Sequence, residues 1–146
     1  MGGERSNHIH RYNLAARQWE AIPTMAPKPE PRAGHSAALH GRNMYIFGGK
    51  GEDNIKFNDF WSFNLDTKKW TQITVDDDLS VPVARSGHAS VAYQDSIVIF
   101  GGIHEITREL NDMHIYDIKT NRWVKIFDEK AANTPMILPS SSPTKT

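Results

Sequence analysis

Histidine has the widest chemical range of any residue type in this chain, which holds seven histidines and no cysteine. Histidine binds metals and transfers protons near neutral pH, whereas thiolate ligands and cysteine nucleophiles are excluded. On an extended segment His8 and His10 would share a face, but no nearby carboxylate or cysteine completes a zinc site. His104 and Glu105 are adjacent, so on an extended segment they would point apart and form a poor chelate. We therefore predict neither a metal site nor a cofactor.

His35 and His88 belong to a repeat, because residues 31–73 and 84–126 are the same segment written twice, offset by 53 positions without a gap. The shared residues, each with a counterpart 53 positions later, are Arg32, Gly34, His35, Phe47, Gly48, Gly49, Asn58, Asp59, Thr67, Trp70 and Ile73. A repeat of this length is typical of a solenoid, a propeller or an array. A repeated residue serves the scaffold first, so we expect His35 and His88 to hydrogen-bond backbone inside their own units, and function to lie where the copies differ.

Each copy contains four short segments with the pattern of β-strands. In the second copy, residues 87–93 have small side chains and high β-propensity, and 97–100 is an apolar run ended by Gly101-Gly102. Two further segments follow, 113–118 and 122–126, and the last of them alternates polar and apolar residues. The apolar run predicts a strand buried on both faces. The first copy divides in the same way, at 34–40, 44–48, 60–65 and 69–73. The sequence therefore predicts an all-β fold of four-stranded antiparallel units.

Tandem units of this kind are the blade pattern of a β-propeller, and the sequence resembles kelch repeats. The resemblance is carried by Arg-x-Gly-His at 32–35 and 85–88, the apolar strand ending in Gly-Gly, Asn-Asp before the third strand, and Phe63 or Tyr116 seven residues before a tryptophan. Residues 1–22 resemble the C-terminal half of a blade, with Tyr12 and Trp19 at the same spacing and His8 in place of the aspartate. We expect an incomplete propeller of about two and a half blades: a half-blade at 1–22, kelch repeats at 23–73 and 74–126, and a disordered Ser/Pro-rich tail at 127–146.

The repeated residues suggest roles in the scaffold. The double glycine predicts a close backbone approach or a bulge at the end of the second strand. Trp19, Trp70 and Trp123 should fill the space between adjacent blades, where a large ring buries much apolar area.

Strand parity places the variable segments at one end of the blades. Successive connections of an antiparallel sheet alternate between its two ends, so 23–31, 50–57, 74–83 and 103–110 should emerge together, opposite the short turns. Binding usually resides in such loops. The candidate partner-binding residues there are Lys50, Asp53, Lys56, His104, Glu105 and Arg108. Asp76-Asp77-Asp78 would add negative charge to the same end.

Arg32 and Arg85 stand where an inter-blade segment becomes a first strand. The kelch resemblance implies a contact with an acidic peptide for both, since arginine at this motif position helps to bind one in some kelch-like proteins. The alternative is a structural pair with a neighbouring Asp or Glu.

Composition excludes several classes of partner. Lys plus Arg and Asp plus Glu number 17 each, so the chain lacks the excess of basic residues that supports binding to nucleic acid. The longest apolar run, 97–100, is too short for a membrane span, and the N-terminus lacks a secretory signal, so we expect a cytoplasmic or nuclear protein that is not secreted. Residues 1–6 match the short pattern for myristoylation at Gly2, which an ordinary exposed N-terminus also explains.

The leading hypothesis is a non-catalytic module that binds a protein or peptide through its inter-blade and strand 2–3 loops. The first alternative is a structural role, as a fragment of a larger propeller or a unit completed by self-association or by further blades. The second is a metal-dependent kelch enzyme. The resemblance implies a Tyr–Cys crosslink for copper radical oxidases, which this chain cannot form, and a carboxylate–histidine cluster for iron enzymes. The sequence carries no nucleophile elbow, phosphate loop or paired-carboxylate motif.

Overall fold

The computed structural model describes residues 4–127, which form ten β-strands and two single 3₁₀ turns. The half-blade consists of β1 (Ile9–Asn13) and β2 (Gln18–Ile22). Blade 1 consists of β3 (Ser36–His40), β4 (Asn43–Phe47), β5 (Phe60–Asn64) and β6 (Lys69–Ile73), and blade 2 of β7 (Ala89–Tyr93), β8 (Ser96–Ile103), β9 (Glu109–Asp117) and β10 (Arg122–Phe127). The 3₁₀ turns are η1 (Glu52–Asn54) and η2 (Asp78–Ser80). Apart from Phe127, the predicted tail at 127–146 lies outside the described residues, as does Gly2.

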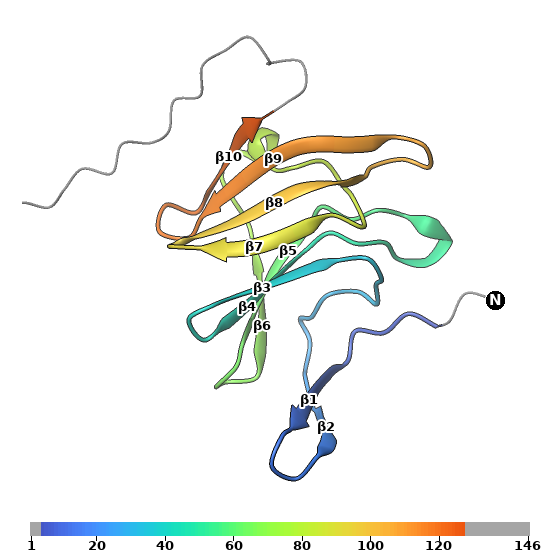
Figure 1. The fold of residues 1–146 in the computed structure, drawn as a ribbon, viewed down its shortest axis with the longest axis vertical. Helices are drawn as coiled ribbons and strands as arrows, with labels where there is room; N and C mark the ends of the chain where they lie inside the picture. The colour runs from blue at the N-terminus through green and yellow to red at the C-terminus, as the bar shows by residue number, and fades with distance from the viewer. Residues whose placement is uncertain (1–3, 128–146) are drawn as a thin grey trace, which may run out of the picture.

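The strands form three antiparallel sheets in the predicted order. The half-blade pairs β1 with β2, blade 1 has the order β3-β4-β5-β6, and blade 2 has the order β10-β9-β8-β7. The sheets follow one another through the molecule, with the β4–β5 and β8–β9 loops at one end and the short β3–β4, β7–β8 and β9–β10 turns at the other (Figure 1). The all-β prediction is confirmed, and the propeller is incomplete. No helix within residues 4–127 is long and apolar enough to cross a membrane.

The second strand of blade 2 continues past the double glycine, contrary to the prediction that it ends there. A register shift between Phe100 and Gly102 forms a bulge, after which Gly102 pairs with Leu110 and Ile103 with Glu109. The predicted loop at 103–110 therefore shortens, because both of its ends join the β8–β9 ladder. In blade 1 the equivalent connection stays irregular and contains η1.

The double glycine also permits the close backbone approach that the sequence predicts. The amide of Gly49 donates to the carbonyl of Arg85 over 2.8 Å, which joins blade 1 to the segment leading into blade 2. A Cβ atom on Gly48, whose φ is +61°, would lie 2.7 Å from the same carbonyl oxygen. A side chain at Gly48 would therefore push the two blades apart.

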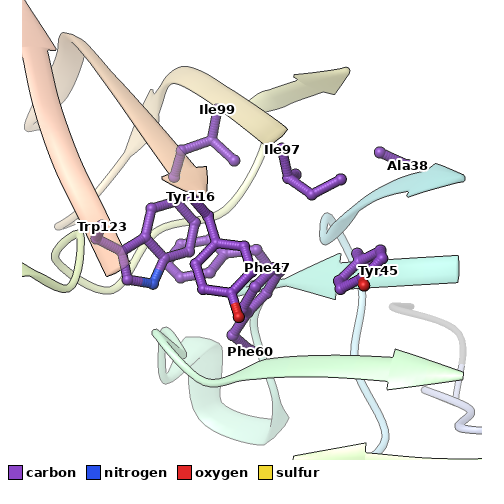
Figure 2. Close-up of a cluster of buried hydrophobic side chains, with 8 residues drawn as sticks. All are labelled: Ala38, Tyr45, Phe47, Phe60, Ile97, Ile99, Tyr116 and Trp123. Atoms are coloured by element: carbon purple, nitrogen blue, oxygen red, sulfur yellow. The ribbon is translucent and has the colours of Figure 1, made fainter. Parts of the chain in front are cut away.

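Adjacent sheets pack through faces of two kinds. We call the side of each sheet that carries the repeated tryptophan its leading face, and the opposite side its trailing face. The core between the blades joins the leading face of blade 2 to the trailing face of blade 1. Figure 2 shows its members: Ala38, Tyr45, Phe47 and Phe60 from blade 1, and Ile97, Ile99, Tyr116 and Trp123 from blade 2. Trp70, Phe63, Ile46 and Trp61 of blade 1 pack in the same way on Ile9 and Ile22 of the half-blade.

Equivalent residues of the two copies differ in burial according to whether a sheet covers them. Phe47 faces blade 2 and is 1% exposed, whereas its counterpart Phe100 is 46% exposed on the uncovered trailing face of blade 2. The prediction that 97–100 is buried on both faces is therefore wrong for this strand, of which only Ile97 and Ile99 are fully buried. Burial on both faces does describe the equivalent strand β4, where Tyr45, Ile46 and Phe47 are all buried between the half-blade and blade 2.

Coverage by a neighbouring sheet also determines which of the three tryptophans are buried. Trp70 and Trp123 are buried between sheets as predicted. Trp19 is 71% exposed, because the described chain places no sheet against the leading face of the half-blade. The prediction that Trp19 fills an inter-blade space is therefore wrong for this structure.

The histidine of the second repeat, His88, joins neighbouring blades instead of bonding within its own. His88 Nε2 and Ser36 Oγ are 2.7 Å apart across the blade junction, and both residues are buried. The predicted bonding inside the blade is therefore wrong for His88, because β7 lies directly beside β3 of the preceding blade. Burial, together with the charge of Arg85, lowers the pKa of His88 to about 4.

Removal of the Phe47 ring should strongly destabilise the fold. Phe47→Ala leaves a cavity in the inter-blade core, so we expect the free energy of unfolding in urea to fall by about 3–5 kcal/mol. Leu39→Ala is the matched control, because Leu39 is an exposed apolar residue of the neighbouring strand β3, and its loss should cost less than about 1 kcal/mol. Equal losses for the two variants would contradict the placement of the core.

His88 should make stability depend on pH between about 4 and 6.5. The unfolded chain binds this proton with a pKa of about 6.5, above the folded value, so the contribution of His88 is present above pH ~6.5 and lost as pH falls towards 4. The full loss is about 3 kcal/mol. Urea unfolding at several pH values should show that the free energy of unfolding changes less with pH in His88→Asn than in the wild type. The pH dependence that remains would come in part from His114, because burial also lowers the pKa of that residue. Parallel pH profiles for both proteins would contradict this assignment.

A candidate partner-binding groove between two loops

The β4–β5 and β8–β9 loops enclose an open groove of about 680 Å³ at the predicted binding end of the blades. Its lining residues are Asp53, Asn54, Ile55 and Lys56 from blade 1, His104, Glu105, Ile106 and Thr107 from blade 2, and Ala84 from the segment between the blades. Four of the predicted site residues, Asp53, Lys56, His104 and Glu105, thus come together in one place. The other two loop candidates, Lys50 and Arg108, stand at the bases of the two loops.

Backbone pairing fixes the base of the β4–β5 loop. Lys50 exchanges two hydrogen bonds with Ala33, over 2.9 and 2.8 Å, and also forms an antiparallel bridge with Lys56. Between these two lysines, η1 turns the chain through Asp53, whose φ of +51° is left-handed. The loop therefore projects Asp53 and Ile55 from a base that the sheet scaffold holds in place.

The β8–β9 loop is a tight turn from His104 to Arg108. The amide of His104 donates to the carbonyl of Arg108 over 2.9 Å, and the ring Nδ1–H donates to the carbonyl of Ala84 over 2.5 Å. Because the segment is a turn, His104 Nε2 lies 3.8 Å from Glu105 Oε1, so the expectation that the two side chains point apart is wrong. The bond to Ala84 anchors the blade 2 side of the groove to the inter-blade segment.

A basic cluster flanks the groove on the blade 1 side. It consists of Arg5, Lys50 and Lys56. Partial burial, with the charges of Lys50 and Arg5, lowers the pKa of the Lys56 ammonium. Lys50 and Lys56 are also joined by a backbone bridge, so their positive charges lie on the same side of the groove. Three acidic residues partly offset the cluster. The Glu52 carboxylate lies 3.6 Å from the Arg5 guanidinium, and Asp53 and Glu105 line the groove.

Arg32 and Arg85 lie beneath the loops and not in the groove. Arg85 is 0% exposed and donates to both carboxylate oxygens of Asp112, over 2.6 and 2.9 Å. Its remaining donors reach the carbonyls of Gly101 and Val83, over 3.1 and 3.0 Å. We call this set of contacts the arginine clamp of blade 2.

Blade 1 holds the same clamp at positions offset by 53. Arg32 donates to both oxygens of Asp59, over 2.6 and 2.7 Å, and to the carbonyls of Gly48 and Glu30, over 2.8 and 3.0 Å. Each clamp carboxylate also hydrogen-bonds a ring nitrogen of the residue two positions later in the sequence. In blade 1 this nitrogen belongs to Trp61, at 2.7 Å, and in blade 2 to His114, at 2.8 Å. Of the two roles that the sequence leaves open for these arginines, the pairing with a neighbouring aspartate is the one observed.

The electrostatics of the clamp hold the carboxylate ionised. Burial alone would raise the pKa of Asp112, but the hydrogen bonds from Arg85 and His114 outweigh it and bring this pKa well below its usual range. The Arg85 guanidinium is 0% exposed and donates four hydrogen bonds inside the fold, so it leaves no surface for a partner in this structure. The groove, and not the arginine pair, is therefore the candidate binding site.

Other predicted features lie elsewhere. Within residues 4–127, no three histidine, aspartate or glutamate side chains gather closely enough to hold a metal ion. The rings of His8 and His10 do share a face, with centroids 6.3 Å apart. Asp76 and Asp77 line a second depression with residues 120–124 of blade 2 and are not among the residues that line the groove.

Two residues that line the groove and one that flanks it escaped the sequence reasoning. Ile55 and Ile106 are exposed apolar side chains, one from each loop, that line the groove together. Their signal was an apolar residue between two polar neighbours, at non-equivalent positions of the two copies. Arg5 lies in the N-terminal segment before β1, and no sequence pattern connects that segment to the loop at 50–57.

The buried clamp should contribute far more to stability than an exposed ion pair. Asp112→Asn leaves the buried Arg85 charge without its counter-ion, so we expect the free energy of unfolding to fall by about 3–5 kcal/mol. Asp66→Asn is the matched control, because it removes the carboxylate of the exposed Arg42–Asp66 pair. Its effect on urea unfolding should be close to zero. A mild effect at Asp112 would show that the clamp is not needed for folding.

Comparison with known proteins agrees with this geometry. A family model described as the KLHDC2/KLHL20/DRC7 Kelch-repeats domain matches residues 1–138. Kelch domain-containing protein 1 of Mus musculus is 35% identical over 124 residues, which are 82% of this chain and 30% of that protein. Kelch domain-containing protein 2 of Bos taurus is 31% identical over 121 residues, 82% of this chain and 29% of that protein. Rho GTPase-activating protein gacHH of Dictyostelium discoideum is 38% identical over 99 residues, 66% of this chain and 6% of that protein.

The chain thus spans less than a third of the length of these relatives. The family match includes the half-blade and both repeats, the units that the strand order and the arginine clamps define independently. The chain therefore belongs to the kelch-repeat family of β-propeller proteins, which generally mediate protein–protein interactions and are generally not enzymes.

Proposed function

We propose that this chain is a non-catalytic binding module that holds a segment of a partner protein in the groove between the β4–β5 and β8–β9 loops. The segment would carry an acidic side chain next to an aliphatic one. The observation that carries the proposal is the basic cluster of Arg5, Lys50 and Lys56 beside two exposed isoleucines, Ile55 and Ile106.

The chemistry of the groove favours such a segment. A carboxylate placed near Lys50 and Lys56 would relieve the mutual repulsion of these cations and form charge-assisted hydrogen bonds. An aliphatic side chain between Ile55 and Ile106 would remove apolar surface from water on both sides. The charged groups would give orientation and a fast encounter, and the isoleucines would lengthen the lifetime of the complex.

The scaffold favours a binding role because it holds the groove open without a partner. One loop comes from each blade, and the segment between the blades forms the floor at Ala84. Hydrogen bonds from Lys50 to Ala33 and from His104 to Ala84 fix both sides. A pre-organised site loses little conformational freedom when a peptide binds, which is the advantage of loops on a rigid sheet.

Selection of peptides from a random display library on the immobilised chain tests this proposal. We expect the selected peptides to combine Asp or Glu with an aliphatic residue, and to bind more weakly as salt rises. Charge reversal by Lys50→Glu with Lys56→Glu should weaken a synthetic selected peptide at least ~10-fold, since losing a charge contact of about 1.4 kcal/mol has that effect.

The matched control reverses two charges at the opposite end of blade 1, by Arg42→Glu with Lys69→Glu. These residues adjoin the short turns, so peptide affinity should change less than about twofold. Circular dichroism and urea unfolding would show that both double variants remain folded. Peptides that bind equally well to the groove variant, or that lose affinity only in the control, would overturn the proposal.

A further inference from the structure

The two walls of the groove differ in charge. On the blade 1 side, the three cations of the basic cluster outnumber the carboxylates of Glu52 and Asp53. On the blade 2 side, the lining residues at 104–107 include one carboxylate, that of Glu105, and none of them is a lysine or arginine. Arg108, which ends the turn, is not among the residues that line the groove. The groove therefore offers one wall to a carboxylate and the other to a cation.

The blade 2 turn presents two hydrogen-bond acceptors close together. The ring Nδ1–H of His104 donates to the carbonyl of Ala84, and a neutral imidazole carries a proton on only one of its nitrogens. Nε2 of the same ring therefore has a free lone pair and acts as an acceptor. It lies 3.8 Å from the second acceptor, Glu105 Oε1. Two acceptors cannot hydrogen-bond each other, so a donor placed between them would satisfy both.

The separation of these two acceptors suits a single cationic group. A charge-assisted hydrogen bond from nitrogen is about 2.8 Å long. Acceptor atoms 3.8 Å apart are close enough for one ammonium, or for two N–H groups of one guanidinium, to reach both at that length. A neutral donor would also fit between them, but only a cation gains the attraction of the carboxylate charge.

Both acceptors are held in position and open to solvent. The bond to Ala84 fixes the ring of His104, and the backbone bond from His104 to Arg108 closes the turn that carries Glu105. The side chain of Glu105 is 69% exposed and that of His104 is 26% exposed. Ile106 follows Glu105 directly and lines the same groove, so the acceptor pair lies beside one of the apolar contacts. A donor entering the groove thus reaches both acceptors without displacing the turn.

We propose that the partner segment carries a lysine or arginine in addition to its acidic and aliphatic residues, and that this cation bridges Glu105 Oε1 and His104 Nε2. The inference rests on the proposed function and specifies its ligand as a segment with both charges. The carboxylate of the segment lies towards Lys50 and Lys56, and its cation lies towards the blade 2 turn. The reverse direction is disfavoured, because it would bring like charges together at both walls.

A double-mutant cycle between the chain and a selected peptide tests the cationic contact. The peptides selected on the groove should contain lysine or arginine. Replacement of that residue by glutamine, or Glu105→Gln in the chain, should each weaken binding at least ~5-fold. The two changes together should cost little more than one alone, because they remove the same contact. Glu105→Lys should prefer a peptide with glutamate in place of the basic residue over the original peptide.

The matched control is Glu109→Gln. It removes a carboxylate of an exposed residue that does not line the groove, four positions after Glu105. Peptide affinity should change less than about twofold. Circular dichroism would show that the variants at both positions remain folded, as expected for exposed side chains.

The outcomes separate this inference from the proposed function. If Lys50→Glu with Lys56→Glu leaves peptide affinity unchanged, the proposed function fails and the inference fails with it. If that variant loses affinity but Glu105→Gln does not, or if the selected peptides lack lysine and arginine, the function stands and the cationic contact is overturned. Nitrogen-15 NMR of the free chain is a second test, in which His104 Nε2 should carry no proton at the pH of the binding assay. A protonated imidazole paired with Glu105 would supply its own donor and overturn the proposal.

Discussion

The arginine clamp is the interaction on which the geometry of the loop end depends. In blade 2 a single guanidinium joins β8 at Gly101, the third strand at Asp112 and the incoming segment at Val83. Only the planar, forked guanidinium can bond both oxygens of one carboxylate and still reach two carbonyls. A buried charge is tolerated only when hydrogen bonds compensate it, so the four contacts of the guanidinium depend on one another. The clamp of blade 1 repeats them, so both loops start from bases with the same geometry while their tips differ.

The stacking of the sheets then determines the burial and the contacts of each repeated residue. Phe47 and Phe100 occupy the same position of the repeat, yet one is in the core and the other faces solvent, because only blade 1 has a sheet on both sides. His35 and His88 differ for the same reason. His88 reaches Ser36 on the first strand of the preceding blade, and the half-blade has no such strand to offer His35. In a stack whose units contact only their neighbours, the environment of a residue is set by the adjacent unit as much as by its own.

This dependence explains which parts could be predicted from the sequence. Sheet order, the shared end of the two loops and most strand positions follow from local alternation, turn residues and parity, and they agree with the structure. The extension of β8 and β9 beyond the predicted ends of these strands does not follow from these patterns. The burial of Trp19 and the His88–Ser36 bond were predicted wrongly, because both depend on the presence and position of a neighbouring sheet. The His104–Glu105 contact was missed for a different reason: a five-residue turn was treated as extended chain. Arg5 joins the basic cluster through a tertiary approach that carries no periodic signal.

The position of the groove follows from combining the clamp with the stacking. Each loop alone projects from one clamp, and the width between the loops is set where the amide of Gly49 meets the carbonyl of Arg85. Ala84, next to that carbonyl, forms the floor and accepts the hydrogen bond from His104. Two adjacent blades are therefore sufficient to build the groove, and the outer faces of the stack do not enter it. For this reason repeated residues can fix the distance between the loops while non-repeated residues at their tips line the groove.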